Sequence, residues 1–94
     1  MKVFYDPAFF KKLKKVDVRV RKSVKERMFL FSKNPHDSQL DNHLLKKEYE
    51  GYRSIDITED WRALYKLKQE KDDSIVYFVT LGTHKELYGK SRKN

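Results

Sequence analysis

The second half of the chain combines side chains that can exchange protons with aromatic side chains. They lie around three segments whose pattern is typical of strands, and they are His43, Asp56, Asp60, Trp61, His84 and Tyr88. Imidazole and carboxylate groups can move protons near neutral pH, and aromatic rings can stack on nucleobases. If these side chains meet at one end of a small sheet, they could bind an RNA strand and act on its phosphodiester bonds. The residue types therefore predict a small ribonuclease.

The net charge also favours an acidic partner. The 94 residues include 22 Lys and Arg against 14 Asp and Glu, a formal net charge of +8. A field of this sign attracts nucleic acid and accelerates encounter with it. The alternative is a basic domain whose lysines are simply hydrated.

The length and composition exclude several classes of protein. Ninety-four residues predict one domain over residues 1–94. The absence of cysteine excludes disulfides, thiolate chemistry and zinc sites built on cysteine. No apolar run approaches the ~18 residues of a membrane span, and the first residues do not resemble a secretory signal, so we expect a cytoplasmic protein. The histidines lack metal-binding spacings, so neither a metal nor another cofactor is expected.

The first third of the chain predicts a strand and two helices. The strand is Lys2–Tyr5, after which Asp6 caps a helix with Pro7 at its first position. Asp17 caps the second helix, which ends at Asn34–Pro35. Apolar side chains recur at helical spacing on the inner sides of both helices, while Lys and Arg face water. These apolar residues are Phe9, Phe10, Leu13, Val16, Val20, Val24, Met28 and Phe31.

Three further strands are predicted after Gly51. They are Tyr52–Ile57, Trp61–Lys68 and Ser74–Leu81, with a charged turn at Gln69–Asp73, and Gly82 ends the last of them. One helical turn at His84–Tyr88 and a polar tail at Lys90–Asn94 follow, whereas His36–Tyr49 has no clear pattern. The predicted fold class is α+β, a βααβββ sandwich with two N-terminal helices on one face of a mostly antiparallel sheet.

Alternation along the strands sorts candidate side chains onto the two faces of the sheet. Ile55 and Ile57 are expected to face the helices, so Asp56 should face away from them. A carboxylate within a strand is disfavoured, and an exposed edge charge is the alternative to a functional role. Arg62 and Lys66 share one parity and would add two phosphate-binding cations if their face is open.

Five short motifs between about Leu40 and Gly89 carry a family resemblance. They are His43-Leu44-Leu45, Gly51-Tyr52-Arg53, Asp60-Trp61, Leu64-Tyr65-Lys66 and the segment from Gly82 to Gly89, which reads GTHKELYG. Together they resemble the YafQ branch of the RelE superfamily, the toxins of type II toxin–antitoxin modules. The preceding order of strand, helix and helix also fits the RelE fold.

This resemblance implies an mRNA endonuclease that acts on the ribosome and is held inactive by a cognate antitoxin; the histidine spacing separately favours catalysis without a metal. It implies catalytic contributions from His43, Asp60, His84 and Tyr88, with support from Trp61. The family pattern has a histidine four residues before the aspartate of the Asp-Trp pair, where this chain has Asp56.

The division of catalytic roles stays open at this point. Either His43 or Asp56 could accept the proton of the RNA 2′-OH, and His84 could protonate the departing 5′ oxygen. The positive charge for the phosphate would come from Arg53, Arg62 or Lys66, and a base would stack on Tyr88 or Trp61.

Two other functions fit the same sequence. Relatives of the ParE type share the fold, lack the histidines and poison DNA gyrase. A member without catalytic activity would bind RNA in a salt-sensitive manner and produce no cleavage products.

Overall fold

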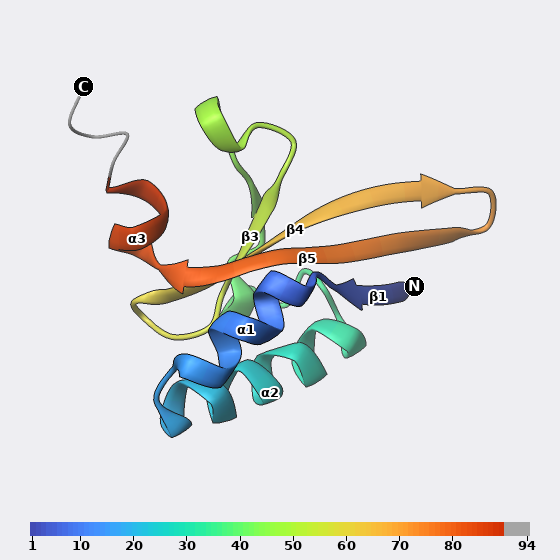
Figure 1. Cartoon of the computed structure of the whole chain (residues 1–94). Helices are drawn as coiled ribbons and strands as arrows, with labels where there is room; N and C mark the ends of the chain where they lie inside the picture. The colour runs from blue at the N-terminus through green and yellow to red at the C-terminus, as the bar shows by residue number, and fades with distance from the viewer. Residues whose placement is uncertain (90–94) are drawn as a thin grey trace.

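A layer of two helices and a five-stranded sheet make up the computed structural model, which describes residues 1–89 (Figure 1). The helices are α1 (Pro7–Lys15), α2 (Val18–Lys33) and the short α3 (His84–Tyr88). The strands are β1 (Lys2–Tyr5), β2 (His43–Leu44), β3 (Arg53–Asp56), β4 (Trp61–Glu70) and β5 (Asp73–Thr83). The predicted α+β fold is confirmed. The tail predicted at Lys90–Asn94 lies outside the described residues.

The two long helices begin where the sequence provides side-chain caps. Asp6 accepts a hydrogen bond of 2.8 Å from the N–H of Ala8, and Pro7 occupies the first helical position. Asp17 accepts one of 2.7 Å from the N–H of Arg19 and so begins α2. Each cap satisfies a backbone donor that has no partner within the helix.

The strands lie in the order β1-β5-β4-β3-β2. β1 runs parallel to β5, and the other neighbours are antiparallel. The predicted bounds of the two long strands were too short, because their pairing continues from Trp61 opposite Thr83 to Glu70 opposite Asp73. Gly82 therefore lies within β5, and the hairpin turn contains only residues 71–72. This long hairpin extends past the helices, toward the right of Figure 1.

The segment without a clear pattern forms three short elements. A 3₁₀ helix at Ser38–Leu40 precedes β2, and a second one at Lys47–Tyr49 precedes β3. The side chain of Leu40 is fully buried and holds this segment against the core. β2 pairs with β3 through only two residues, which is too short for a pattern of alternation to reveal.

The hydrophobic core lies between the sheet and the pair α1 and α2. Its buried members include Phe9, Phe31, Phe78, Ile55 and Ile57, and Ala63 and Tyr65 of β4. A register shift between Leu64 and Tyr65 allows both Phe78 and Leu81 of β5 to face this core. Since Ala63 and Tyr65 face the helices, Arg62 and Lys66 lie on the opposite face, as their parity predicts.

No helix within residues 1–89 has the length and apolarity needed to cross a bilayer.

Candidate active site

A pocket of about 330 Å³ collects several of the candidate side chains. Its lining residues are Asp41, His43, Arg62, His84 and Tyr88. Pairing of His43 with Ser54, and of Asp56 with Arg62, places this pocket on the sheet face that the two long helices leave free. A larger hollow of about 490 Å³ lies at the tip of the β4–β5 hairpin, but it is formed by residues 69–73 alone and contains no imidazole. The pocket lined by His43 and His84 is therefore the candidate active site.

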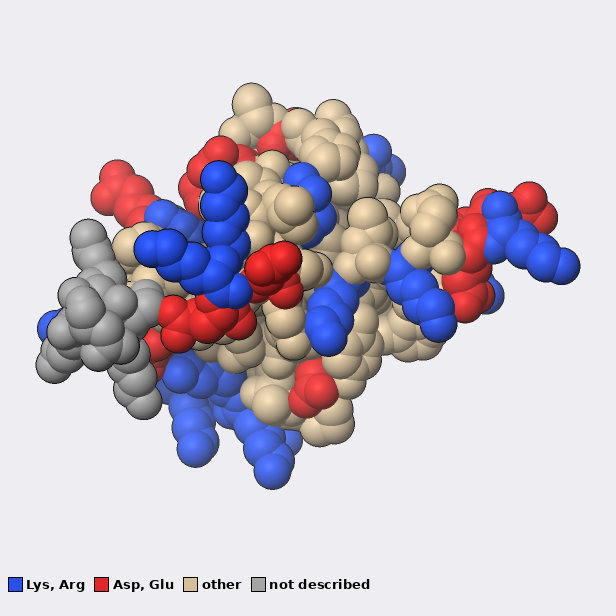
Figure 2. All heavy atoms as spheres, turned by 90° about the horizontal axis from the view of Figure 1, so that it is seen from above, with Lys and Arg blue, Asp and Glu red and all other residues tan. Residues whose placement is uncertain are grey.

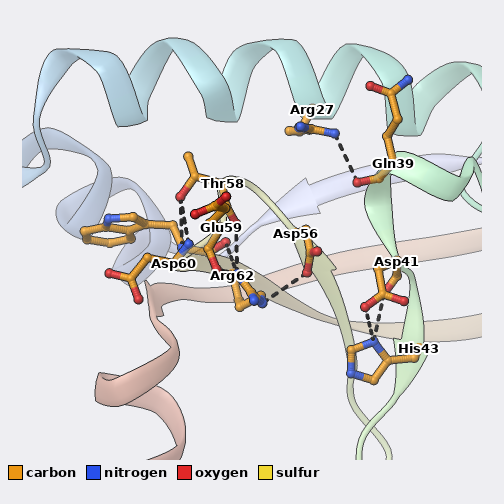
Figure 3. A network of polar contacts seen from close by, with 10 residues as sticks. Arg27, Gln39, Asp41, His43, Asp56, Thr58, Glu59, Asp60 and Arg62 are labelled. Atoms are coloured by element: carbon orange, nitrogen blue, oxygen red, sulfur yellow. Dashed lines mark hydrogen bonds and ion pairs between the residues drawn. The ribbon is translucent and has the colours of Figure 1, made fainter.

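The ring of His43 is held in one orientation by Asp41. Its Nδ1 lies 2.7 Å from the main-chain carbonyl oxygen of Asp41 and 3.8 Å from the carboxylate Oδ2 of the same residue (Figure 3). A carbonyl oxygen only accepts hydrogen bonds, so Nδ1 carries the proton in this contact. In the neutral ring, Nε2 is then the nitrogen with a free lone pair, as a general base requires.

His84 and Tyr88 come from α3, which begins directly after β5. Thr83 caps this helix in a capping box with Glu86, with contacts of 3.0 Å and 2.9 Å. The rings of His84 and Tyr88 lie one helical turn apart, with centroids separated by 4.7 Å. The hydroxyl of Tyr49 donates a 2.7 Å hydrogen bond to the carbonyl of Leu87 and so attaches α3 to the loop before β3.

Arg62 connects this pocket to the turn that precedes β4. Its Nη1 donates to the carbonyl oxygens of Thr58 at 2.9 Å, Glu59 at 2.9 Å and Trp61 at 3.1 Å. Its Nε forms an ion pair with Oδ1 of Asp56 (Figure 3), and the two atoms are 3.0 Å apart. The side chain is 17% exposed, so most of the guanidinium is fixed by these contacts.

Asp56 lies opposite Arg62 on β3 and does not line the pocket. Its Oδ1 is buried and accepts no well-aligned hydrogen bond within residues 1–89, so Arg62 stabilises it as an ion pair only. Burial raises the pKa of the Asp56 carboxyl, while the charge of Arg62 opposes that rise. The negative charge of the Asp41 carboxylate also raises the pKa of Asp56.

The side chains of Asp60 and Trp61 do not line the pocket. The side chain of Asp60 is exposed in the turn, while its carbonyl oxygen accepts a 2.8 Å hydrogen bond from the N–H of His84. Trp61 is partly buried and packs against the hydrophobic core. It shares the parity of Ala63 on β4, and its side chain therefore faces the helical layer.

The other two predicted cations lie outside the pocket. Arg53 has the same parity on β3 as Ile55, which faces the helices, and its Nε donates a 2.9 Å hydrogen bond to Oδ1 of Asn42. Lys66 is exposed on the same face as Arg62, with its Nζ 4.8 Å from the ring centre of Tyr52. Of the predicted site residues, the pocket thus brings together His43, Arg62, His84 and Tyr88. Asp41 was not among the residues predicted from the sequence.

Within residues 1–89 no three His, Cys, Asp or Glu side chains form a cluster that could hold a metal ion. The face seen in Figure 2 carries acidic and basic side chains intermixed. The net charge is unevenly divided along the chain. Residues 1–33 contain 11 Lys and Arg against three Asp and Glu, whereas residues 34–94 contain 11 of each. The excess of positive charge therefore belongs to β1, α1 and α2, and the segments that build the pocket are balanced overall.

Comparison with known proteins identifies relatives of this chain. Residues 1–89 match the family model described as bacterial toxin of type II toxin–antitoxin system, YafQ. YafQ from E. coli strain BL21(DE3) is similar in structure, with 27% identity, a TM-score of 0.75, and coverage of 94% of this chain and 98% of that one. No curated protein sequence matches the chain closely.

Two complexes contain chains of the same fold. The E. coli DinJ–YafQ toxin–antitoxin complex includes one with 26% identity, a TM-score of 0.73, and coverage of 94% of this chain and 97% of that one. The RelBE2 complex from Mycobacterium tuberculosis includes one with 20% identity, a TM-score of 0.69, and coverage of 88% and 96%. This last likeness concerns the fold alone.

Proposed function

The chain belongs to the YafQ family of type II toxin–antitoxin toxins, and on that premise we propose that it is a metal-independent endoribonuclease that cleaves mRNA on the ribosome. The observation that carries the proposal is the single pocket lined by His43, His84 and Arg62. Transfer of a phosphoryl group from the 5′ oxygen to the 2′ oxygen of RNA needs a base, an acid and a positive charge, which two imidazoles and a guanidinium can supply.

The proposed reaction uses the RNA itself as the nucleophile. Nε2 of His43 accepts the proton of the 2′-OH as the 2′ oxygen forms a bond to phosphorus. The bond from phosphorus to the 5′ oxygen breaks, and His84 donates a proton to that oxygen. The products are a 2′,3′-cyclic phosphate and a 5′-hydroxyl end, and Arg62 offsets the negative charge that develops on the phosphate.

His43 is a better candidate for the base than Asp56. The contact of its Nδ1 with the carbonyl of Asp41 leaves Nε2 available to accept a proton. Asp56 lies outside the pocket and is paired with Arg62 at 3.0 Å. We therefore assign Asp56 the role of orienting Arg62.

The remaining predicted residues receive more indirect roles. Tyr88 lies beside His84 and offers a ring on which a base can stack. Asp60 positions His84 through its carbonyl oxygen. Lys66, exposed on the face of the pocket, is the proposed contact for a neighbouring phosphate. Trp61 and Arg53 support the structure around the site.

The division of charge favours the ribosome over free RNA as the partner. The excess positive charge lies in β1, α1 and α2, while the pocket opens on the other face of the sheet. A single-stranded RNA that is attracted to the two helices would not be placed at the pocket by this attraction. A large RNA assembly that surrounds the molecule could bind the helices and present an mRNA to the pocket at the same time.

The relatives also suggest a protein partner. The E. coli YafQ relative was solved in complex with DinJ as a toxin–antitoxin complex. We propose that a cognate antitoxin likewise binds this chain, and that the toxin acts in the cytoplasm, where ribosomes translate.

Primer extension on mRNA, incubated with the protein in the presence and absence of ribosomes, tests the proposed activity. The His84→Ala variant should cleave about 100-fold more slowly or worse, because it lacks the proposed acid. The matched control is His36→Ala, since His36 is the third histidine, is exposed and does not line the pocket. Equal cleavage by His84→Ala and the wild type would remove His84 from the mechanism. Inhibition of gyrase on supercoiled DNA, without RNA cleavage, would favour the ParE-like function instead.

The proposed role of the helices has a separate test. Replacing Lys11, Lys14 and Lys15, all exposed on α1, by Gln should weaken ribosome binding and lower its dependence on salt. Each lost phosphate contact should reduce the slope of log K against log salt by about 0.7–0.9. Lys71→Gln, in the hairpin turn, is the control for loss of one positive charge. An unchanged salt slope in the triple variant would contradict this role of α1.

A further inference from the structure

We propose that Asp41 is a positioning residue that fixes the ring of His43 for catalysis. Its main-chain carbonyl determines which nitrogen of His43 carries the proton, and its carboxylate balances the charge of the ring after proton transfer. This inference rests on the proposed function for its catalytic consequence, but the assignment of the His43 tautomer can be tested without it.

The first observation is the unusual backbone of Asp41. Its φ of 46° and ψ of 48° lie in the left-handed region, which few residues other than glycine adopt at low cost. Asp and Asn are among the more tolerant residues there. This conformation ends the 3₁₀ helix at Ser38–Leu40 and places the Asp41 carbonyl 2.7 Å from Nδ1 of His43. Such a conformation persists only where the surrounding structure enforces it.

The second observation is how firmly the neighbouring residues are held. On one side, Leu40 is fully buried in the core. On the other side, Nδ2 of Asn42 donates to the carbonyl of Pro35 at 2.8 Å and to the hydroxyl of Tyr65 at 2.7 Å. Arg53 donates to Oδ1 of the same Asn42 at 2.9 Å. Asp41 thus lies between two anchors, and its carbonyl is fixed with respect to β3 and β4.

The third observation concerns the carboxylate. Asp41 lines the pocket together with His43, and its Oδ2 lies 3.8 Å from Nδ1. Once Nε2 has taken the proton of the 2′-OH, the ring is positively charged and Nδ1 still faces Asp41. The carboxylate then forms an ion pair with the ring. Because the two side chains are 49% and 71% exposed, this ion pair is screened by water and its effect should be modest.

Three variants separate the carbonyl from the carboxylate. Asp41→Gly keeps the left-handed backbone and the carbonyl but removes the carboxylate. Asp41→Asn keeps the backbone preference and the shape of the side chain without its charge. Asp41→Val disfavours the left-handed backbone and should move the carbonyl away from Nδ1. Asp72→Asn, in the exposed hairpin turn, is the control for loss of one negative charge.

The decisive measurement is the ¹⁵N NMR spectrum of the His43 ring in the free protein, at a pH of about 8.5 where histidine is neutral. The wild type, Asp41→Gly and Asp41→Asn should all carry the proton on Nδ1, whereas Asp41→Val should carry it wholly or partly on Nε2. A merely structural role of Asp41 would not change this signature in a folded variant, and the spectrum of the backbone amides reports the fold. A wild-type proton on Nε2, or an Asp41→Val ring with the wild-type spectrum, would overturn the inference.

Cleavage kinetics test the catalytic consequence. Asp41→Gly and Asp41→Asn should lower kcat about two- to fivefold, as expected for an exposed ion pair, with little change in KM. Asp41→Val should lower kcat about tenfold or more, because part of the population lacks a free Nε2. Equal kcat values for Asp41→Val and the wild type would overturn the positioning role. Absence of cleavage by the wild type would refute the proposed function, while the NMR result would still decide the tautomer.

Discussion

Replacement of Gly82 by alanine should displace α3 from the sheet. Gly82 lies opposite Arg62 on the pocket face, and Leu87 of α3 packs directly over it. A Cβ atom at this position would lie 3.1 Å from both Cγ and Cδ2 of Leu87 and 3.4 Å from Oε1 of Glu86. The first two distances are shorter than ordinary contacts between carbon atoms, so the Leu87 side chain would have to give by a few tenths of an ångström, and we expect α3 to shift with it.

The expected losses of stability and of cleavage rate depend on how firmly α3 is packed. An added methyl group in a packed region typically costs about 1–3 kcal/mol of unfolding free energy. Because Leu87 is only partly buried and α3 has only five residues, we expect the lower end, about 1 kcal/mol. A shift of about 1 Å in a catalytic group costs about 100-fold in rate, so a displacement of a fraction of that distance should cost about tenfold. Urea unfolding measures the first quantity, and primer extension on programmed ribosomes measures the second.

A double-mutant cycle with Leu87→Ala tests the stated cause. If the clash with the Leu87 side chain is responsible, Gly82→Ala should cost less in the Leu87→Ala background, by about 0.5 kcal/mol or more. An equal cost in both backgrounds would show that the methyl group added at position 82 and the Leu87 side chain do not interact, and the clash could not be the cause of the lost stability. Unchanged stability and cleavage in the single variant would refute it directly.

Two further variants test contacts around the pocket. Tyr49→Phe removes the hydroxyl that donates to the carbonyl of Leu87, and should lower the unfolding free energy by about 1 kcal/mol in urea titrations; an unchanged value would show that this hydrogen bond does not hold α3. In Asp56→Asn, the effect on stability should depend on pH. Burial raises the pKa of Asp56 in the folded state, so the wild type loses stability as pH rises from the ordinary range near about 4 through the folded pKa, and the variant does not. The unfolding free energy of the variant relative to the wild type should therefore increase from pH about 3.5 to pH about 7.5, and a constant difference would contradict the raised pKa.

Local signals explain why much of the fold could be predicted from the sequence. Asp6, Pro7 and Asp17 act within two or three residues of themselves, so the starts of both helices could be read directly. The parity of Ile55 and Ile57 needs only their own strand, and both face the core as predicted. β2 could not be predicted, because a strand of two residues exists only through its pairing with β3.

The candidate site was predictable to the extent that its side chains come with recognisable motifs. His43, His84 and Tyr88 were found through their residue types, and the pocket brings them together. Asp41 was not predicted because its proposed role depends on a left-handed backbone and on a main-chain carbonyl. Neither feature can be inferred from the residue type. The sequence predicts Arg53 as a possible phosphate contact, but its partner Asn42 lies in a segment without periodicity, so this contact could not be foreseen.

Arg62 shows why a residue of this pocket cannot be interpreted from its charge alone. Its Nη1 binds three carbonyl oxygens of the turn before β4, and the carbonyl of Asp60 in that turn binds the N–H of His84. Its Nε also neutralises Asp56. A lysine has no planar fork and could not make these contacts together. Loss of cleavage in Arg62→Lys would therefore report a displaced His84 as well as a weaker phosphate contact, and only the spectrum of the His84 ring and amide would separate the two causes.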